Sequence, residues 1–202
     1  MKLVVIKYNA GNIQSLMFAL QRLAVPSLLT NDPEEIISAD KVIFPGVGEA
    51  SSTMKYLRKH GLDRVIPQLK QPVLGICLGL QLMCKYSQEG DTDCLGIFDQ
   101  HVLLFRNNGQ PEEEESFKVP HMGWNDIYQL DKSLFKDIPE HAYMYFVHSY
   151  YATKGADTIA TTKYITEYSS ALHKDNFYAV QFHPEKSGDI GHRIIDNFLK
   201  LC

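Results

Sequence analysis

The sequence predicts a three-layer α/β fold: a mostly parallel central sheet, helices on both of its faces, and an antiparallel extension in the C-terminal half. Two observations predict it. Short apolar runs alternate with helix-like patterns in the N-terminal half. In the C-terminal half the apolar runs are short and separated by polar turns, which is typical of antiparallel strands. A chain of 202 residues has the size of one ordinary domain, so residues 1–202 are expected to form a single domain.

The N-terminal half supplies the parallel part of the sheet and most of the helices. Bounded apolar runs predict strands at residues 3–6, 41–44 and 72–76. Asn12 is expected to cap a helix, because apolar residues follow it at three- and four-residue spacing: Ile13, Leu16, Met17, Leu20 and Leu23. Further helices are predicted near residues 50–59, near 61–69 with an end around Pro67, and directly after Cys77.

The C-terminal half is predicted to add strands and one closing helix. The strands are expected at residues 102–105, 143–147, 158–161, 170–173 and 177–182. The helix is predicted after Ser187, with apolar residues on one side: Ile190, Ile194, Phe198 and Leu201. No internal repeat or low-complexity linker interrupts the sequence, and the acidic run at residues 112–115 is expected to be a solvated loop.

The composition excludes several classes of protein. The net charge is −4 and there is no basic stripe, so nucleic acid is not an expected partner. Residues 1–6 suit a first strand better than a signal peptide, and no apolar run approaches the roughly 18 residues of a membrane helix. A cytoplasmic protein without membrane contact is therefore expected. The four cysteines form no C-x-x-C pair and are expected to be free thiols, and no metal or cofactor is predicted.

A cysteine between two glycines ends one of the predicted strands. In Gly75-Ile76-Cys77-Leu78-Gly79 the glycines permit a tight turn from strand to helix, which is the form of a nucleophile elbow with sulfur in place of oxygen. Backbone N–H groups at the start of the following helix favour a thiolate. A buried structural cysteine is the alternative that this pentapeptide alone leaves open.

A base for this thiol is expected near the other end of the chain. The last predicted strand leads into His183-Pro184-Glu185. His183 is the predicted base and Glu185 its orienting group, because side chains two residues apart on an extended segment lie on the same side. A histidine capping a strand beside a surface glutamate is the alternative for this segment alone. The elbow and this segment together favour a Cys-His-Glu triad.

The loop Pro45-Gly46-Val47-Gly48 is a candidate oxyanion site. It follows a predicted strand, and its backbone N–H groups could stabilise a developing negative charge together with the N–H of Leu78. A dinucleotide-binding fingerprint would need a third glycine at position 51, which is a serine, and a simple strand-to-helix turn is the remaining alternative.

Three single residues are further candidates. Gln81 lies one helical turn beyond Cys77 and could bind a polar substrate group, whereas an exposed helix glutamine without a role is the alternative. His148 is a second candidate for the base. It ranks below His183 because it lacks a carboxylate two residues on. Trp124, the only tryptophan, is predicted to be either a core residue or an interface anchor.

With these motifs assembled, nearly the whole chain resembles the class I glutamine amidotransferases. The elbow and the His-Pro-Glu segment carry the family-wide resemblance. A narrower resemblance, to the glutaminase subunits of imidazole glycerol phosphate synthases, is carried by residues 8–12, 44–48, 120–125, 145–150 and 181–188. One departure is Lys7-Tyr8-Asn9, since an acidic residue is common after the first strand of this family.

The resemblance implies that the chain hydrolyses glutamine and passes ammonia to a (β/α)8-barrel cyclase, with which it forms a heterodimer of histidine biosynthesis. It implies that Cys77 is the nucleophile, that His183 and Glu185 complete the triad, and that backbone N–H groups of Gly46, Val47, Gly48 and Leu78 hold the oxyanion. The residues implied to bind glutamine are Gly48, Gln81, Glu89, Ser149 and Tyr150. Those expected to face the cyclase are Asn12, Trp124, Tyr145 and Lys186. The oxyanion loop is expected to be misaligned in the isolated chain.

Three alternatives remain open from the sequence. A related amidotransferase that supplies ammonia for surface sugars would have the same triad, and a cyclase-coupled assay distinguishes it. A stand-alone thiol hydrolase would turn over rapidly without a partner. A non-catalytic binding subunit would leave Cys77 unmodified by a glutamine-like electrophile, even with the partner present.

Overall fold

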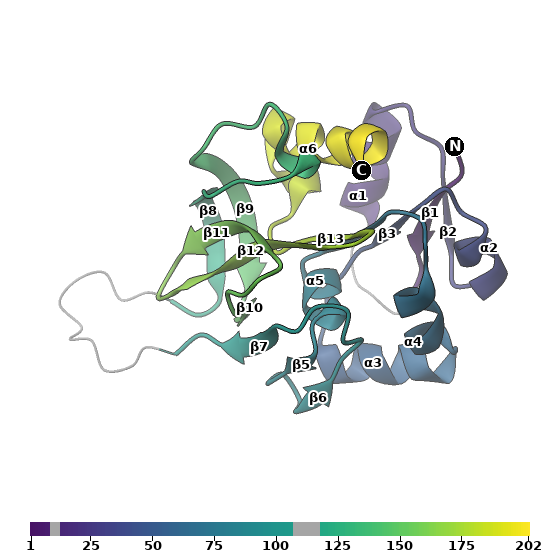
Figure 1. The fold of residues 1–202 in the computed structure, drawn as a ribbon, viewed down its shortest axis with the longest axis horizontal. Helices are drawn as coiled ribbons and strands as arrows, with labels where there is room; N and C mark the ends of the chain where they lie inside the picture. Colours follow the sequence, from purple (N-terminus) through teal and green to yellow (C-terminus); the bar gives the residue numbers. More distant parts are fainter. Residues whose placement is uncertain (9–12, 107–117) are drawn as a thin grey trace.

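A central sheet organises the residues that this computed structural model describes, namely 1–8, 13–106 and 118–202 (Figure 1). The parallel strands come first in the sheet order: β2 (Ser27–Thr30), β1 (Leu3–Ile6), β3 (Lys41–Phe44), β4 (Val73–Ile76) and β13 (Phe177–Val180). The sheet continues, mostly antiparallel, through β12 (Glu167–Lys174), β10 (Tyr150–Ala152), β7 (His101–Leu104), β5 (Tyr86–Ser87) and β6 (Thr92–Asp93), and β11 (Thr158–Lys163) also pairs with β12. The predicted fold class is confirmed.

Helices cover both faces of this sheet (Figure 1). One layer holds α1 (Gln14–Arg22) and α6 (Gly188–Leu201), and the other holds α3 (Ala50–Lys59), α4 (Leu62–Val65) and α5 (Leu78–Met83). Alternation along β1 explains the two layers. Val5 packs in the same cluster as Leu20 of α1 and Phe198 of α6, whereas Val4 packs in the cluster of Leu57 of α3. Strands buried on both faces are expected of a parallel sheet covered by helices.

A separate ribbon of two strands, β8 (His121–Ile127) and β9 (Ala142–His148), lies beside the antiparallel extension (Figure 1). Its register pairs Trp124 with Tyr145 and Met122 with Val147. Side chains alternate between faces along each strand, so one face of the ribbon is buried while the other exposes large apolar groups: Met122, Trp124 and Tyr143. β8 was not predicted, because Pro120 and Gly123 resemble turn residues.

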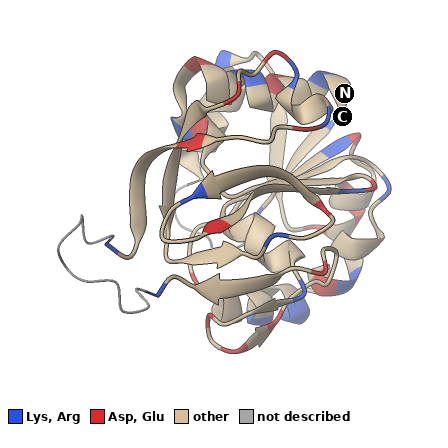
Figure 2. Ribbon diagram, turned by 60° about the vertical axis from the view of Figure 1, so that its left-hand side comes forward, with Lys and Arg blue, Asp and Glu red and all other residues tan. Residues whose placement is uncertain are grey.

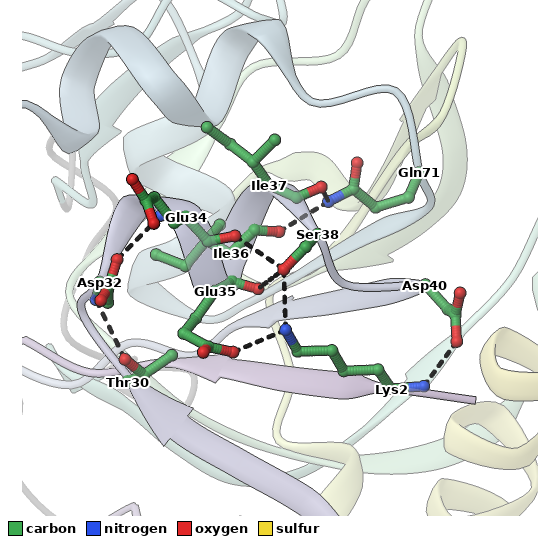
Figure 3. Close-up of polar contacts among 10 residues, drawn as sticks. All are labelled: Lys2, Thr30, Asp32, Glu34, Glu35, Ile36, Ile37, Ser38, Asp40 and Gln71. Carbon is green, nitrogen blue, oxygen red and sulfur yellow. Dashed lines mark hydrogen bonds and ion pairs between the residues drawn. The ribbon is translucent and has the colours of Figure 1, made fainter.

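A short helix at the edge of the sheet, α2 (Pro33–Ile37), was also not predicted. Asp32 caps it by accepting a hydrogen bond from the Glu34 N–H at 2.9 Å (Figure 3). Lys2, which directly precedes β1, forms an ion pair with Glu35 at 2.6 Å (Figure 3). A five-residue helix is too short to be stable alone, so it depends on these contacts and on the burial of Ile36 in the core.

The remaining predicted helices and strands are present, and the bounds of one helix need correction. The helix predicted near 61–69 is a single turn, α4, followed by a 3-10 turn at Ile66–Gln68 that contains Pro67. Leu201 lies on the predicted side of α6, seven residues after the buried Ile194, but as the last residue of the helix it is 43% exposed. The Asn12 cap and the acidic loop at 112–115 lie outside the described residues.

Acidic and basic residues are interspersed over the described part of the chain (Figure 2). None of the helices in the described ranges is long and apolar enough to cross a membrane. The four cysteines are free, as predicted. The described part of the chain contains no group of three or more His, Cys, Asp or Glu side chains that could hold a metal ion.

Candidate active site

Three parallel strands bring the candidate residues to one edge of the sheet. β3 ends at Phe44 before the Gly46 loop, β4 ends directly before Cys77, and β13 leads towards His183. β4 pairs with both of the other strands, and the Cys77 N–H donates to the Val180 carbonyl at 2.8 Å. Ligands of open α/β sheets bind outside the carboxyl ends of the strands, which is where these residues meet.

Cys77 occupies a strained turn between β4 and α5. Its φ of +52° lies in the left-handed region that residues other than glycine rarely adopt. Packing explains the neighbouring glycines: a Cβ on Gly79 would overlap the Phe44 carbonyl oxygen, and one on Gly46 would lie 2.5 Å from the Gly79 nitrogen. The turn therefore seats α5 directly against the end of β3 and leaves Cys77 7% exposed.

His183 and Glu185 form a buried pair, in which Nδ1 of the ring lies 2.9 Å from Oε1 of the carboxylate. The prediction that an extended segment joins these two residues is wrong. β13 ends at Val180, and Pro184–Lys186 forms a 3-10 turn that brings the carboxylate back to the ring. Ser187 Oγ donates to the His183 carbonyl at 2.7 Å and so closes this turn.

The His183 ring also lies near the Cys77 sulfur, whose charge acts on it. Since Nδ1 faces Glu185, Nε2 is the nitrogen left for the sulfur. Burial lowers the pKa of His183, but the charge and hydrogen bond of Cys77, followed by those of Glu185, raise the pKa to about 10. The arrangement places an imidazole beside the thiol whose proton it can take, which is the pairing that makes a cysteine nucleophilic.

One N–H group expected to hold an oxyanion is already occupied. Leu78 N–H donates to the Gly46 carbonyl at 3.4 Å, within the predicted oxyanion loop. The Tyr8 hydroxyl donates to the preceding Pro45 carbonyl at 2.6 Å and anchors the same loop. Gly48 has a φ of +129°, which only glycine adopts easily. An oxyanion could use the Leu78 N–H only after the Gly46 carbonyl moves away.

The Glu89 side chain reaches the N-terminus of α3 from the turn between β5 and β6. Its Oε2 accepts a hydrogen bond from the Ala50 N–H at 2.8 Å. Burial raises the pKa of Glu89, the Ala50 hydrogen bond lowers it, and the charge of Glu49 raises it again. A cationic ligand group would stabilise the charged carboxylate, so this position suits an ammonium group.

Gln81 contacts the segment 149–150 on one side and Gln181 on the other. Gln81 Nε2 donates to the Tyr150 carbonyl at 2.9 Å. The Ser149 carbonyl accepts a hydrogen bond from the Phe105 N–H at 3.0 Å. Gln81 is buried, so the alternative of an inert exposed helix glutamine is wrong.

His148 is not placed to act as the base. Its Nδ1 lies 2.8 Å from the Tyr150 carbonyl, and its Nε2 lies 3.2 Å from the Tyr168 hydroxyl. Burial lowers its pKa to about 3, with the charges of His121 and His183 acting in the same direction and the Tyr150 hydrogen bond opposing them. The ring is therefore neutral and serves as a buried hydrogen-bonding group.

Gln181 was not among the predicted site residues. This side chain is fully buried, and its Nε2 lies 3.6 Å from the Cys77 sulfur, while its Oε1 accepts from Gln81 Nε2 at 3.0 Å. The available signal was an amide inside an otherwise apolar predicted strand, two residues before His183, since buried polar groups in cores need specific partners.

The proposed partner residues surround Tyr145. Trp124 is 55% exposed, so it is not a core residue, and its ring meets that of Tyr145 edge-on with centroids 6.0 Å apart. Lys186 Nζ lies 6.0 Å from the Tyr145 ring centroid. The Tyr145 carbonyl accepts a hydrogen bond from the His183 N–H at 2.9 Å, so this surface is directly connected to the candidate base.

Comparisons with known proteins identify the family. Residues 4–202 match the model described as glutamine amidotransferase class-I. Imidazole glycerol phosphate synthase subunit HisH of Bacteroides fragilis (strain YCH46) is 59% identical over 201 residues, which cover 100% of each chain. The subunit of the same name from Vibrio parahaemolyticus serotype O3:K6 is 41% identical, covering 99% of this chain and 98% of its own.

Two crystal structures described as glutamine amidotransferases share the fold. One has a TM-score of 0.72 at 18% identity and covers 97% of this chain and 96% of its own. The other, from Thermotoga maritima, has a TM-score of 0.65 at 15% identity and covers 98% and 82%.

The chain therefore belongs to the class-I glutamine amidotransferases, enzymes that hydrolyse glutamine. The thiol, imidazole and carboxylate at the strand ends suit that chemistry. Within the family, full-length identity groups the chain with the HisH subunits of imidazole glycerol phosphate synthase.

Proposed function

We propose that this chain is the cytoplasmic glutaminase subunit of an imidazole glycerol phosphate synthase in histidine biosynthesis. It hydrolyses glutamine to glutamate and passes the ammonia to a (β/α)8-barrel cyclase, which makes imidazole glycerol phosphate and an aminoimidazole carboxamide ribonucleotide. The observation that carries the proposal is the His183 ring, which lies near the Cys77 sulfur and has its Nδ1 2.9 Å from the Glu185 carboxylate.

In the proposed mechanism His183 takes the thiol proton of Cys77, and the sulfur attacks the side-chain carbonyl carbon of glutamine. The His183 imidazolium gives its proton to the departing ammonia, and a γ-glutamyl thioester forms on the sulfur. The neutral ring then takes a proton from water, whose oxygen attacks the thioester, so that glutamate leaves and the thiolate is restored with its imidazolium. Glu185 keeps Nδ1 protonated and the ring in place throughout.

Glutamine is proposed to bind between Gly48, Gln81 and Glu89, assisted by the backbone of Ser149 and Tyr150. Glu89 takes the ammonium group of the substrate. Both amide hydrogens of Gln81 are directed to protein acceptors, at 2.9 and 3.0 Å, so its substrate contact is made through Oε1. The oxyanion is held by N–H groups of Leu78 and of the loop at Gly46, Val47 and Gly48.

The cyclase is proposed to dock on the exposed face of the β8–β9 ribbon, around Trp124, Tyr145 and Lys186. Asn12, assigned to the same contact, lies outside the described residues. Docking realigns the oxyanion loop, which requires the Gly46 carbonyl to leave the Leu78 N–H. An enclosed passage keeps the ammonia unprotonated and therefore nucleophilic.

Substitution of the nucleophile tests the proposal. Cys77→Ala in the complex with the cyclase should abolish glutamine-dependent synthesis yet leave synthesis from added ammonia intact, because the alanine removes only the sulfur. Both rates are measured by following product formation with each nitrogen source. Loss of both activities together would mean that Cys77 serves folding or docking instead.

The cyclase and its nucleotide ligand test the pathway. Glutamate production by the chain alone is compared with production after the cyclase and nucleotide are added, and stimulation is expected. An unchanged glutaminase rate would remove the histidine assignment in favour of a different acceptor, and rapid turnover by the chain alone would indicate a stand-alone hydrolase.

A further inference from the structure

We propose that Gln181 is a further catalytic residue, whose side-chain N–H holds the Cys77 thiolate for attack. The inference rests on the proposed hydrolysis of glutamine at Cys77. Gln181 follows the last residue of β13, is fully buried, and places Nε2 3.6 Å from the sulfur. This distance is within the range for a hydrogen bond to the larger sulfur atom.

The direction of this amide is set by its neighbours. A backbone carbonyl only accepts hydrogen bonds, so the Tyr150 carbonyl requires the nitrogen of Gln81 to face it, at 2.9 Å. The same nitrogen lies 3.0 Å from the Gln181 amide and must donate there, which places the oxygen of Gln181 towards Gln81. The nitrogen of Gln181 is then left facing the Cys77 sulfur.

The series of hydrogen bonds continues from the Tyr150 carbonyl to His148 and Tyr168. The Tyr150 carbonyl also accepts from His148 Nδ1 at 2.8 Å, which assigns the proton of this neutral ring to Nδ1. Nε2 of His148 is then an acceptor, and the Tyr168 hydroxyl lies 3.2 Å from it. The Tyr168 hydroxyl also lies 3.4 Å from His121 Nδ1, so the orientation of the Gln181 amide is set by the Tyr150 carbonyl and not by this hydroxyl.

A thiolate at this position needs such a donor. As a thiol, Cys77 directs its S–H towards the Val147 carbonyl, 3.8 Å away. Once ionised, the sulfur gains nothing from that carbonyl and depends on groups that donate. The His183 imidazolium is one, and Gln181 supplies a neutral second donor from a different direction.

The test measures the reactivity of the sulfur without glutamine or the cyclase. Gln181→Met keeps the side-chain size and removes the donor, and Gln100→Met removes another buried glutamine as a matched control. Iodoacetamide alkylation of Cys77 is followed by peptide mass spectrometry across a pH series, with Cys202 in the same sample as reference. The other titratable groups that face the sulfur, His183, Tyr8 and Tyr168, are retained.

Gln181→Met should slow Cys77 alkylation at neutral pH roughly 10- to 100-fold, as expected for one lost hydrogen bond to a charged group, and move its pH profile upward. Cys202 and the Gln100→Met variant should react as in the wild type. In the complex, kcat for glutamine should fall while KM stays unchanged, because Gln181 contacts the sulfur and not the substrate.

Wild-type alkylation in Gln181→Met would overturn the inference, as would slowed alkylation with an unchanged kcat. If Gln181→Met does not fold, Gln181→Asn supplies the same measurements, because its shorter side chain cannot reach Gln81 and the sulfur together. The readout is independent of the proposed function: that function fails if Cys77→Ala retains glutamine-dependent synthesis, whatever the alkylation rates are.

Discussion

Replacement of Glu185 by glutamine perturbs the charge of the pair while keeping its size. Burial lowers the pKa of His183, and Cys77 followed by Glu185 raise it to about 10. A hydrogen bond to a charged group contributes about 1.5–3 kcal/mol, which corresponds to about 1–2 pKa units. Glu185→Gln should therefore lower the pKa of His183 by about 1–2 units. Cys77→Ala should lower it further, since the sulfur contributes more than the carboxylate.

The assay is an NMR titration of the ring in protein labelled at histidine, with the His183 signal assigned by its loss in His183→Gln. Glutaminase activity of each variant in the complex is measured over the same pH range. A His183 pKa that is unchanged in Glu185→Gln would refute the reasoning. A smaller shift in Cys77→Ala than in Glu185→Gln would refute the ranking of the two groups.

The same pair makes folding stability depend on pH. The His183 pKa is raised from 6.5 to about 10, so the folded state binds this proton more tightly than the unfolded state does. The stability it contributes is fully present below pH 6.5 and is lost as the pH rises through about 10. The free energy of unfolding, measured in urea across this interval, should fall less in Glu185→Gln than in the wild type.

Two further substitutions test the packing of the elbow and the docking face. Gly79→Ala should destabilise the fold by about 3 kcal/mol or more in urea unfolding, because the new Cβ would overlap a backbone carbonyl. Gly96→Ala should cost only about 1–2 kcal/mol of left-handed backbone strain, since nothing lies within 4 Å of that Cβ, and an equal loss in both variants would contradict the packing argument. Trp124→Ala should leave the thermal unfolding midpoint unchanged and weaken cyclase binding at least about tenfold in titration calorimetry. Unchanged affinity would place the partner on another surface.

Periodicity and turn chemistry accounted for most of the fold. The strand at 41–44 and the α1 helix follow from local patterns of apolar residues, and both are present. β8 was missed because Pro120 and Gly123 are turn formers whose effect the pairing with β9 overrides. Leu201 is on the predicted side of α6 but is 43% exposed at the end of the helix, because apolar spacing gives the side of a helix but not the burial of its last turn.

The candidate site was predicted in its chemistry and only partly in its geometry. The sequence Gly75-Ile76-Cys77-Leu78-Gly79 predicts a tight turn with a thiol, because few residues other than glycine tolerate the close packing around that turn. The pairing of His183 with Glu185 was expected for the wrong reason, since a 3-10 turn and not an extended strand joins them.

Residue types and their local spacing thus established the layers, the elbow and the kinds of group that gather at the strand ends, because short-range sterics and burial act on neighbours in the chain. Strand order and register decided which of these groups contact one another. They set an amide 3.6 Å from the Cys77 sulfur and a Gly46 carbonyl against the Leu78 N–H. Contacts of this kind join segments that are distant in sequence, and their distances arise only when the whole sheet has assembled.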